Sequence, residues 1–177
     1  MELKQIYTSD AEYYSFTERL LTDSFPQNEY RDLCDFRKYT DSNPLFHNNI
    51  IFEKEKLLGF ITYWDFPHFV YAEHFAIDKS FQGRGYGAFS LYLLKKVISK
   101  PIVLEVELPI NTQSIRRIKF YQRQGFILWN NYYEQPPYRP TDSSYPMSIM
   151  SYGNMNGIVD FQEVRGTIYK EVYGVDL

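Results

Sequence analysis

The chain has 177 residues, of which 44% are hydrophobic and 23% are charged. This length and composition favour a single folded domain with a sizeable core. A net charge of −3 supplies no overall positive field, so we expect no nucleic-acid partner. Cys34 is the only cysteine, which excludes an internal disulfide and argues against a thiol-based metal site.

Targeting signals are absent from the sequence pattern. The residues from Met1 to Lys4 lack the apolar run of a signal peptide. No stretch approaches the roughly 20 apolar residues that a membrane span needs. We therefore expect a cytoplasmic protein with no membrane partner and no metal.

Apolar periodicity and helix-breaking residues predict the elements of the first half of the chain. Ser9 and Asp10 can cap a first helix, which Pro26 ends. Asn43 and Pro44 end a second helix. In chain order, the predicted elements are a strand at 3–8, a helix between Asp10 and Pro26, a helix at 29–39, and strands at 49–53, 57–64 and 69–77.

The second half continues with a similar alternation of helices and strands. The predicted elements are a helix at 88–100, a strand at 102–108, a helix from Asn111 or Thr112 to Gln124, strands at 126–133 and 146–152 around a proline-rich loop at 134–145, and a last helix starting at Asp160. That helix carries an apolar stripe of Phe161, Val164, Ile168 and Val172. The order predicts an α/β chain with a mixed sheet. We divide it into a domain at 1–152 and a C-terminal helical extension at 153–177, packed on the domain or at a homodimer interface.

A glycine-rich segment, Gln82-Gly83-Arg84-Gly85-Tyr86-Gly87, joins the strand at 69–77 to the helix at 88–100. Its three glycines leave backbone N–H groups unshielded where a helix begins, which suits a polyphosphate. A plain strand-to-helix turn is the simplest alternative. A dinucleotide-binding loop is another, but residues 78–82 separate the strand from the first glycine, whereas that fold turns almost directly into glycine.

A second motif lies downstream, where Phe120-Tyr121 is followed by Gly125-Phe126. With both motifs in view, the chain resembles the Gcn5-related N-acetyltransferase superfamily. That family has the pattern Gln/Arg-x-x-Gly-x-Gly/Ala shortly after an apolar strand, here Gln82 to Gly87 after Ile77. It also has an aromatic-Tyr-x-x-x-Gly-Phe pattern on the next helix. The clear resemblance covers residues 69–133.

The resemblance implies a single-domain α/β fold with a mixed, mostly antiparallel central sheet of about seven strands, flanked by helices, and an extra C-terminal helix. It also implies acetyl-CoA as a co-substrate. The loop would hold the pyrophosphate, the strand backbone would pair with the pantetheine arm, and the N–H of Ile77 or a neighbour would face the thioester carbonyl. The implied acetyl-CoA-binding residues are Phe75, Ala76, Ile77, Gln82, Gly83, Arg84, Gly85, Tyr86, Gly87 and Asn111. Asn111 can equally serve only as a helix cap.

Acetylation of an amine requires a base for the incoming ammonium and benefits from an acid for the departing thiolate. Tyr121 occupies the position of the general acid in the resembled family, although it could be a core aromatic. Glu105 and Glu107 share one face of their strand, where like charges would raise the pKa of one of them. Leu104-Glu105-Val106 also resembles the strand of ribosomal-protein alanine N-acetyltransferases that carries the base. Glu73 is the rival base, and an ordinary solvated or salt-bridged strand carboxylate is the alternative for all three.

The predicted function is transfer of acetyl from acetyl-CoA to a primary amine of a small molecule or peptide. The alternative is a non-catalytic acyl-CoA-binding or sensing module. The resemblance places the acceptor between residues 25–30 and the loop at 132–145, where Glu134 and several aromatic side chains suit a cationic amine. Trp64 and Phe66 could add to this wall or could simply fill the core.

Overall fold

A computed structural model describes residues 1–176. This part of the chain contains eight strands, five α-helices and two short 3-10 helices. The elements divide between two compact units, one from Met1 to Ser99 and the other from Lys100 onward. None of the described helices is both long and apolar enough to cross a membrane.

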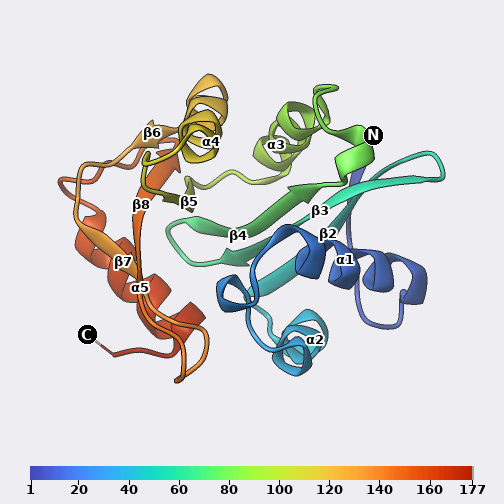
Figure 1. Cartoon of the computed structure of the whole chain (residues 1–177), viewed down its shortest axis with the longest axis horizontal. Helices are drawn as coiled ribbons and strands as arrows, with labels where there is room; N and C mark the ends of the chain where they lie inside the picture. Colours follow the sequence, from blue (N-terminus) through green and yellow to red (C-terminus); the bar gives the residue numbers. More distant parts are fainter. Residues whose placement is uncertain (177) are drawn as a thin grey trace. The chain divides into compact units, whose positions relative to one another are not determined.

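The first unit contains four strands, each antiparallel to the next along the chain. Figure 1 shows α1 and α2 on one side of these strands and α3 on the other. The elements are β1 (Glu2–Gln5), α1 (Ala11–Ser24), η1 (Gln27–Glu29), α2 (Leu33–Ser42), β2 (Phe46–Glu53), β3 (Lys56–Asp65), β4 (Val70–Ile77), η2 (Lys79–Phe81) and α3 (Tyr86–Val97).

Helices on both faces explain why consecutive residues of the first unit's strands are buried. Phe60 and Ile61, neighbours on β3, are 0% and 1% exposed although their side chains point to opposite faces. On α1 the buried positions recur every three or four residues, as one helix face requires. Trp64 and Phe66 are also buried, so our suggestion that they line an acceptor wall is wrong.

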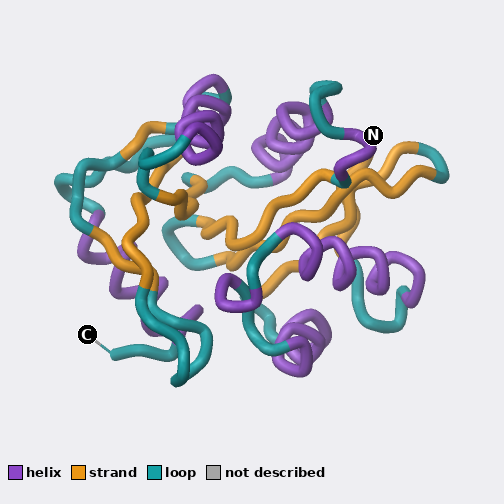
Figure 2. The backbone as a smooth tube through the Cα atoms, in the orientation of Figure 1, coloured by secondary structure: helices purple, strands orange, loops and turns teal. Residues whose placement is uncertain are grey.

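The second unit is organised around β8 (Tyr145–Tyr152). β5 (Ile102–Glu107) pairs with β8 along its whole length, and β6 (Ile127–Leu128) and β7 (Tyr133–Gln135) pair with successive parts of the same strand. All three pairings are antiparallel. The helices are α4 (Thr112–Arg123) and α5 (Phe161–Tyr173). A long loop, drawn in teal in Figure 2, connects β7 to β8.

The single strand predicted at 126–133 is in fact two short strands. Trp129 still bonds to β8, because its backbone N–H donates to the Ile149 carbonyl at 2.9 Å, and its buried indole Nε1 donates to Ser151 Oγ at 2.9 Å. The chain then leaves the ladder and returns at Tyr133, so the start of the predicted loop at 134–145 is strand β7.

The predicted helix at 29–39 also begins later than expected. Residues 27–29 form a 3-10 turn, and α2 starts at Leu33 after the N-cap Asp32, whose carbonyl accepts from Phe36 N at 2.9 Å. The apolar stripe of the last helix is confirmed, because Phe161, Val164, Ile168 and Val172 are its buried residues.

Candidate functional site

The glycine-rich loop lies between the end of β4 and the start of α3. Gly83 and Gly85 have φ angles of 75° and 85°, in the left-handed region that favours glycine. A Cβ atom at either position would meet nothing within 4 Å. The backbone conformation, and not a lack of space, therefore requires glycine here, and the open surroundings leave the loop accessible.

Two contacts fix the start of this loop on β4. The Gln82 side-chain amide donates to the Ile77 carbonyl at 2.9 Å, which ties the loop back to the strand end. Asp78 accepts from the Ser80 backbone N–H at 2.9 Å and forms a tight turn. The loop therefore follows the strand in a defined geometry.

The N-terminus of α3 completes a site that fits an anion. The first hydrogen bond within the helix runs from Phe89 N to Gly85 O at 3.1 Å. The N–H groups of Tyr86, Gly87 and Ala88 consequently have no acceptor inside the helix. They lie at its N-terminus, where the helix dipole places partial positive charge. The exposed Arg84 adds a positive charge. The residues present therefore suit a polyphosphate such as the pyrophosphate of CoA.

The end of β4 is a packed strand with a close neighbour. Ile77 joins Ile51 and Leu58 in a buried cluster, against which Phe75 and Tyr86 also pack. On β3, a Cβ atom at Gly59 would lie 2.2 Å from the Ala76 carbonyl oxygen. Glycine at this position therefore lets the two strands approach and sets where the backbone of residues 75–77 runs.

Glu73 lies at a bulge of β4. Thr62 pairs with His74 and Tyr63 with Ala72, so Glu73 is the extra residue of the ladder. Its fully buried carboxylate forms an ion pair with Arg31, whose guanidinium also stacks over Tyr39 at 4.7 Å. Burial acts to raise the pKa of Glu73, but the charges of Arg31 and His74 outweigh it and lower the pKa to about 2. No local pattern predicts Arg31 as the partner of Glu73, because the two residues lie 42 positions apart.

Glu105 on β5 is held by two tyrosine hydroxyls. Tyr133 of β7 donates to Oε1, and Tyr173, the last residue of α5, donates to Oε2 at 2.9 Å. The pKa of Tyr133 is raised well above its usual value, by burial first and then by the Glu105 charge. Alternation along residues 133–135 could have suggested Tyr133, but no local pattern links Tyr173 to Glu105.

Glu107, two residues along the same strand, has a different environment. Arg117 of α4 donates to its Oε2 at 2.8 Å. The Glu107 carboxylate is thus paired with a guanidinium, which is the salt-bridged alternative and not a like-charge pair with Glu105.

Tyr121 lies on α4 among aromatic rings. Its ring centroid is 5.2 Å from that of Phe120 and 5.5 Å from that of Phe126. Burial raises the pKa of Tyr121 to about 12, although the charge of Arg117 acts in the opposite direction. The hydroxyl therefore keeps its proton at neutral pH.

Asn111 is the N-cap of α4. Its Oδ1 accepts from Ser114 N at 2.8 Å, and Ser114 Oγ accepts from Asn111 N at 3.2 Å, which together form a capping box. The structure therefore shows the helix-capping part of the dual role expected for Asn111.

The predicted site residues divide between the two units. The first unit contains the loop, Glu73 and Ile77, and the second contains Glu105, Asn111 and Tyr121.

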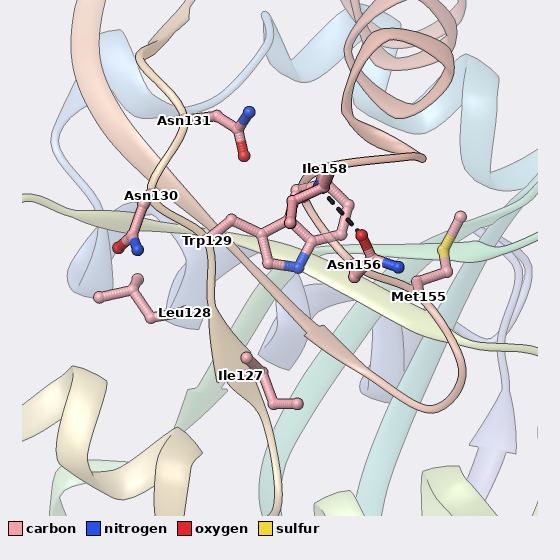
Figure 3. Close-up of a pocket in the computed structure, with 9 residues that line it drawn as sticks. Ile127, Leu128, Trp129, Asn130, Asn131, Met155, Asn156 and Ile158 are labelled. Atoms are coloured by element: carbon pink, nitrogen blue, oxygen red, sulfur yellow. Dashed lines mark hydrogen bonds between the residues drawn. The ribbon is translucent and has the colours of Figure 1, made fainter.

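A hollow of about 370 Å³ in the second unit is lined by none of the predicted site residues. Figure 3 shows Trp129 at its centre, with Asn156 bonded to the backbone of Ile158. A Cβ atom at Gly157 would lie 3.0 Å from the Trp129 ring, so the loop needs glycine to pack there.

Among residues 1–176, no cluster of three His, Cys, Asp or Glu side chains could hold a metal ion.

Comparison with known proteins agrees with this arrangement. The model of the acetyltransferase (GNAT) family matches residues 3–126. A solved structure from Bacteroides thetaiotaomicron, described as an acetyltransferase of the GNAT family, is 46% identical with a TM-score of 0.97 and covers 99% of this chain and 100% of its own. No curated protein matches the chain significantly.

Two more distant structures share the fold. An aminoglycoside 6'-N-acetyltransferase in complex with coenzyme A is 14% identical, with a TM-score of 0.64 over 86% of this chain and 96% of its own. The ribosomal-protein-S18-alanine N-acetyltransferase of Escherichia coli is 20% identical, with a TM-score of 0.57 over 86% of this chain and 96% of its own.

The chain therefore belongs to the acetyltransferase (GNAT) family. The predicted fold class, an α/β fold with a mostly antiparallel sheet, is confirmed. Family membership supports acetyl transfer as the general activity. The family model ends before β7, β8 and α5, which include two of the residues around Glu105.

Proposed function

We propose that the protein transfers the acetyl group of acetyl-CoA to a primary amine of a small molecule or peptide, by direct attack of the amine on the thioester. The observation that carries this proposal is the glycine loop between β4 and α3, with left-handed Gly83 and Gly85, in a member of the acetyltransferase family. An aminoglycoside acetyltransferase of similar fold binds coenzyme A, which supports acetyl-CoA as the co-substrate here.

In this proposal the loop from Gln82 to Gly87 and the N-terminus of α3 hold the pyrophosphate of acetyl-CoA. The backbone of Phe75, Ala76 and Ile77 pairs with the pantetheine arm. A backbone N–H at or next to Ile77 donates to the thioester oxygen as the tetrahedral intermediate forms. A donor of this kind contributes about 3 kcal/mol to the transition state. Asn111 caps α4 and also contacts the CoA arm.

Glu105 is the base that we propose for the incoming ammonium. It is partly exposed, and two hydroxyls hold its carboxylate in a fixed orientation. Glu73 stays second, because the ion pair with Arg31 lowers its pKa to about 2 and makes it a weak base at neutral pH. Losing a proton lets the amine nitrogen attack the carbonyl carbon, and the C–S bond then breaks.

Tyr121 is the acid that we propose for the departing thiolate. With a pKa raised to about 12, its hydroxyl is protonated throughout the neutral range. A protonated hydroxyl can donate to the sulfur as negative charge develops there. The role is assigned from the position of Tyr121 in the family motif.

The acceptor site that we propose includes the loop between β7 and β8. Tyr132, 76% exposed, donates to the carboxylate of Glu134, which lies on β7 directly before this loop. A carboxylate beside aromatic faces suits a cationic amine.

We also propose a cytoplasmic location. For the C-terminal extension we propose the first of the two alternatives, packing on the domain, which is supported by the burial of the apolar stripe of α5.

Calorimetry followed by an assay of released thiol tests the proposal. We expect acetyl-CoA and CoA to bind and NAD not to bind, and we expect CoA release to depend on an added amine. Binding of NAD alone would refute the acetyl-CoA site. Tight acetyl-CoA binding without turnover on a panel of amines and amino-terminal peptides would favour the alternative, a non-catalytic acyl-CoA sensor.

A further inference from the structure

The last turn of α5 reaches the carboxylate that we propose as the base. Tyr173 ends this helix, and its hydroxyl donates to Glu105 Oε2 at 2.9 Å. The two residues are 68 positions apart in sequence. Since the family model ends at residue 126, this contact comes from a part of the chain that the model does not cover.

The direction of the Tyr173 hydroxyl proton is set by a second hydrogen bond. The side-chain amide of Gln135, which is only 9% exposed, donates to the same hydroxyl oxygen at 2.7 Å. An amide N–H can only donate, so it occupies an acceptor position of the oxygen, and the single O–H of Tyr173 is left to point at Glu105. Gln135, Tyr173 and Glu105 thus form a directional chain.

The end of α5 is fixed in place by its packing. The Tyr173 ring lies 4.9 Å from the ring of Tyr138, and the Tyr169 hydroxyl donates to the Glu134 carbonyl. Gly174, in the left-handed region with φ 68°, ends the helix directly after Tyr173. Because this packing already fixes the Tyr173 side chain, little further conformational entropy is lost when its hydroxyl binds Glu105.

We propose that Tyr173 is a positioning residue for Glu105 and that α5 is therefore part of the acetyl-transfer site. This inference rests on the proposed function. Tyr133 holds one carboxylate oxygen and Tyr173 the other, so the carboxylate cannot rotate freely. The proton that the acceptor ammonium loses is received by this oriented carboxylate. Other charged or titratable groups close to Glu105 are Tyr169 and, along β5, Glu107 with its partner Arg117.

The first test measures Glu105 directly and needs no turnover. In full-length protein carrying ¹³C at the glutamate carboxyls, the Glu105 signal is assigned by its loss in Glu105→Gln. A hydrogen bond to a charged group favours the ionised form, so Tyr173→Phe should raise the titration midpoint of Glu105 by about one pH unit. Gln135→Met, which leaves the tyrosine in place, should shift it less in the same direction. The control is Tyr92→Phe, which removes the hydroxyl of a half-exposed side chain on α3 and should leave the Glu105 midpoint unchanged.

The second test is kinetic. Tyr173→Phe should lower kcat/KM for the amine about tenfold and move the acidic limb of its pH profile upward, while acetyl-CoA affinity stays at the wild-type value. In the Glu105→Gln background the same change should cause no further loss, because residues that act as one unit are not additive. An equal loss in both backgrounds, or an unchanged Glu105 titration in an active enzyme, overturns this inference alone. A wild-type protein that acetylates no amine overturns the proposed function instead.

Discussion

Replacing Arg31 by methionine should strongly destabilise the first unit. The change removes the charge that compensates Glu73 but keeps a long apolar side chain against the aromatic rings of Tyr39 and Trp64. The carboxylate of Glu73 is fully buried. The substitution therefore leaves a buried charge without its main partner.

The size of the loss follows from the pKa of Glu73. Lowering this pKa from 4.5 to about 2 corresponds to about 3 kcal/mol of stability at neutral pH. Breaking a buried ion pair by removing one partner typically costs about 3–5 kcal/mol. We therefore expect Arg31→Met to lower the free energy of unfolding by about 3–5 kcal/mol at pH 7.

The loss should shrink in acid, and its sign can be worked out. In the wild type the lowered pKa contributes stability that is complete above pH 4.5 and disappears as the pH falls toward 2. In the variant, burial without Arg31 raises the pKa of Glu73, so protonation on acidification relieves the penalty. The two stability curves should converge below pH 4.

Urea denaturation followed by circular dichroism measures these free energies. The matched control is Arg37→Met, which breaks the ion pair with Glu18 on the surface, where the Arg37 side chain is 55% exposed. That change should cost less than about 1 kcal/mol. Adding Glu73→Gln to Arg31→Met should recover part of the loss. A cost for Arg31→Met below 1 kcal/mol, or one that is equal at pH 7 and pH 3, would refute the reasoning.

Three further predictions concern the proposed site. Tyr121→Phe should lower kcat by about 10²-fold with little effect on acetyl-CoA binding in calorimetry, and an unchanged kcat would remove Tyr121 from the acid role. Gly85→Ala should weaken acetyl-CoA binding and cost about 1–2 kcal/mol in thermal unfolding, because φ is 85° there; wild-type affinity would argue against the loop. Asn111→Ala should cost about 1 kcal/mol in thermal unfolding by opening the capping box with Ser114, and calorimetry should show a separate loss of acetyl-CoA affinity; unchanged affinity would leave Asn111 with the capping role alone.

Local sequence patterns determined the α/β order, the glycine loop and the apolar stripe of α5. Each of these depends on residues within one or two turns of each other. Gly83 and Gly85 can adopt the left-handed backbone of the loop because they have no Cβ atom. The apolar stripe from Phe161 to Val172 predicts that this face of the helix is buried against other apolar side chains.

Only the tertiary structure decided which carboxylates have which partners. Glu73 and Glu105 look alike in sequence, since each lies on an apolar strand. Folding brings Arg31 to Glu73 from 42 residues away, and Tyr173 to Glu105 from 68 residues away. The buried guanidinium of Arg31 lowers the pKa of Glu73 and so makes it a weak base. Glu105 is partly exposed, and two tyrosine hydroxyls orient its carboxylate. Ion pairs and hydrogen bonds act over a few ångströms, so their partners are fixed by the packing of distant elements and not by the pattern around each residue.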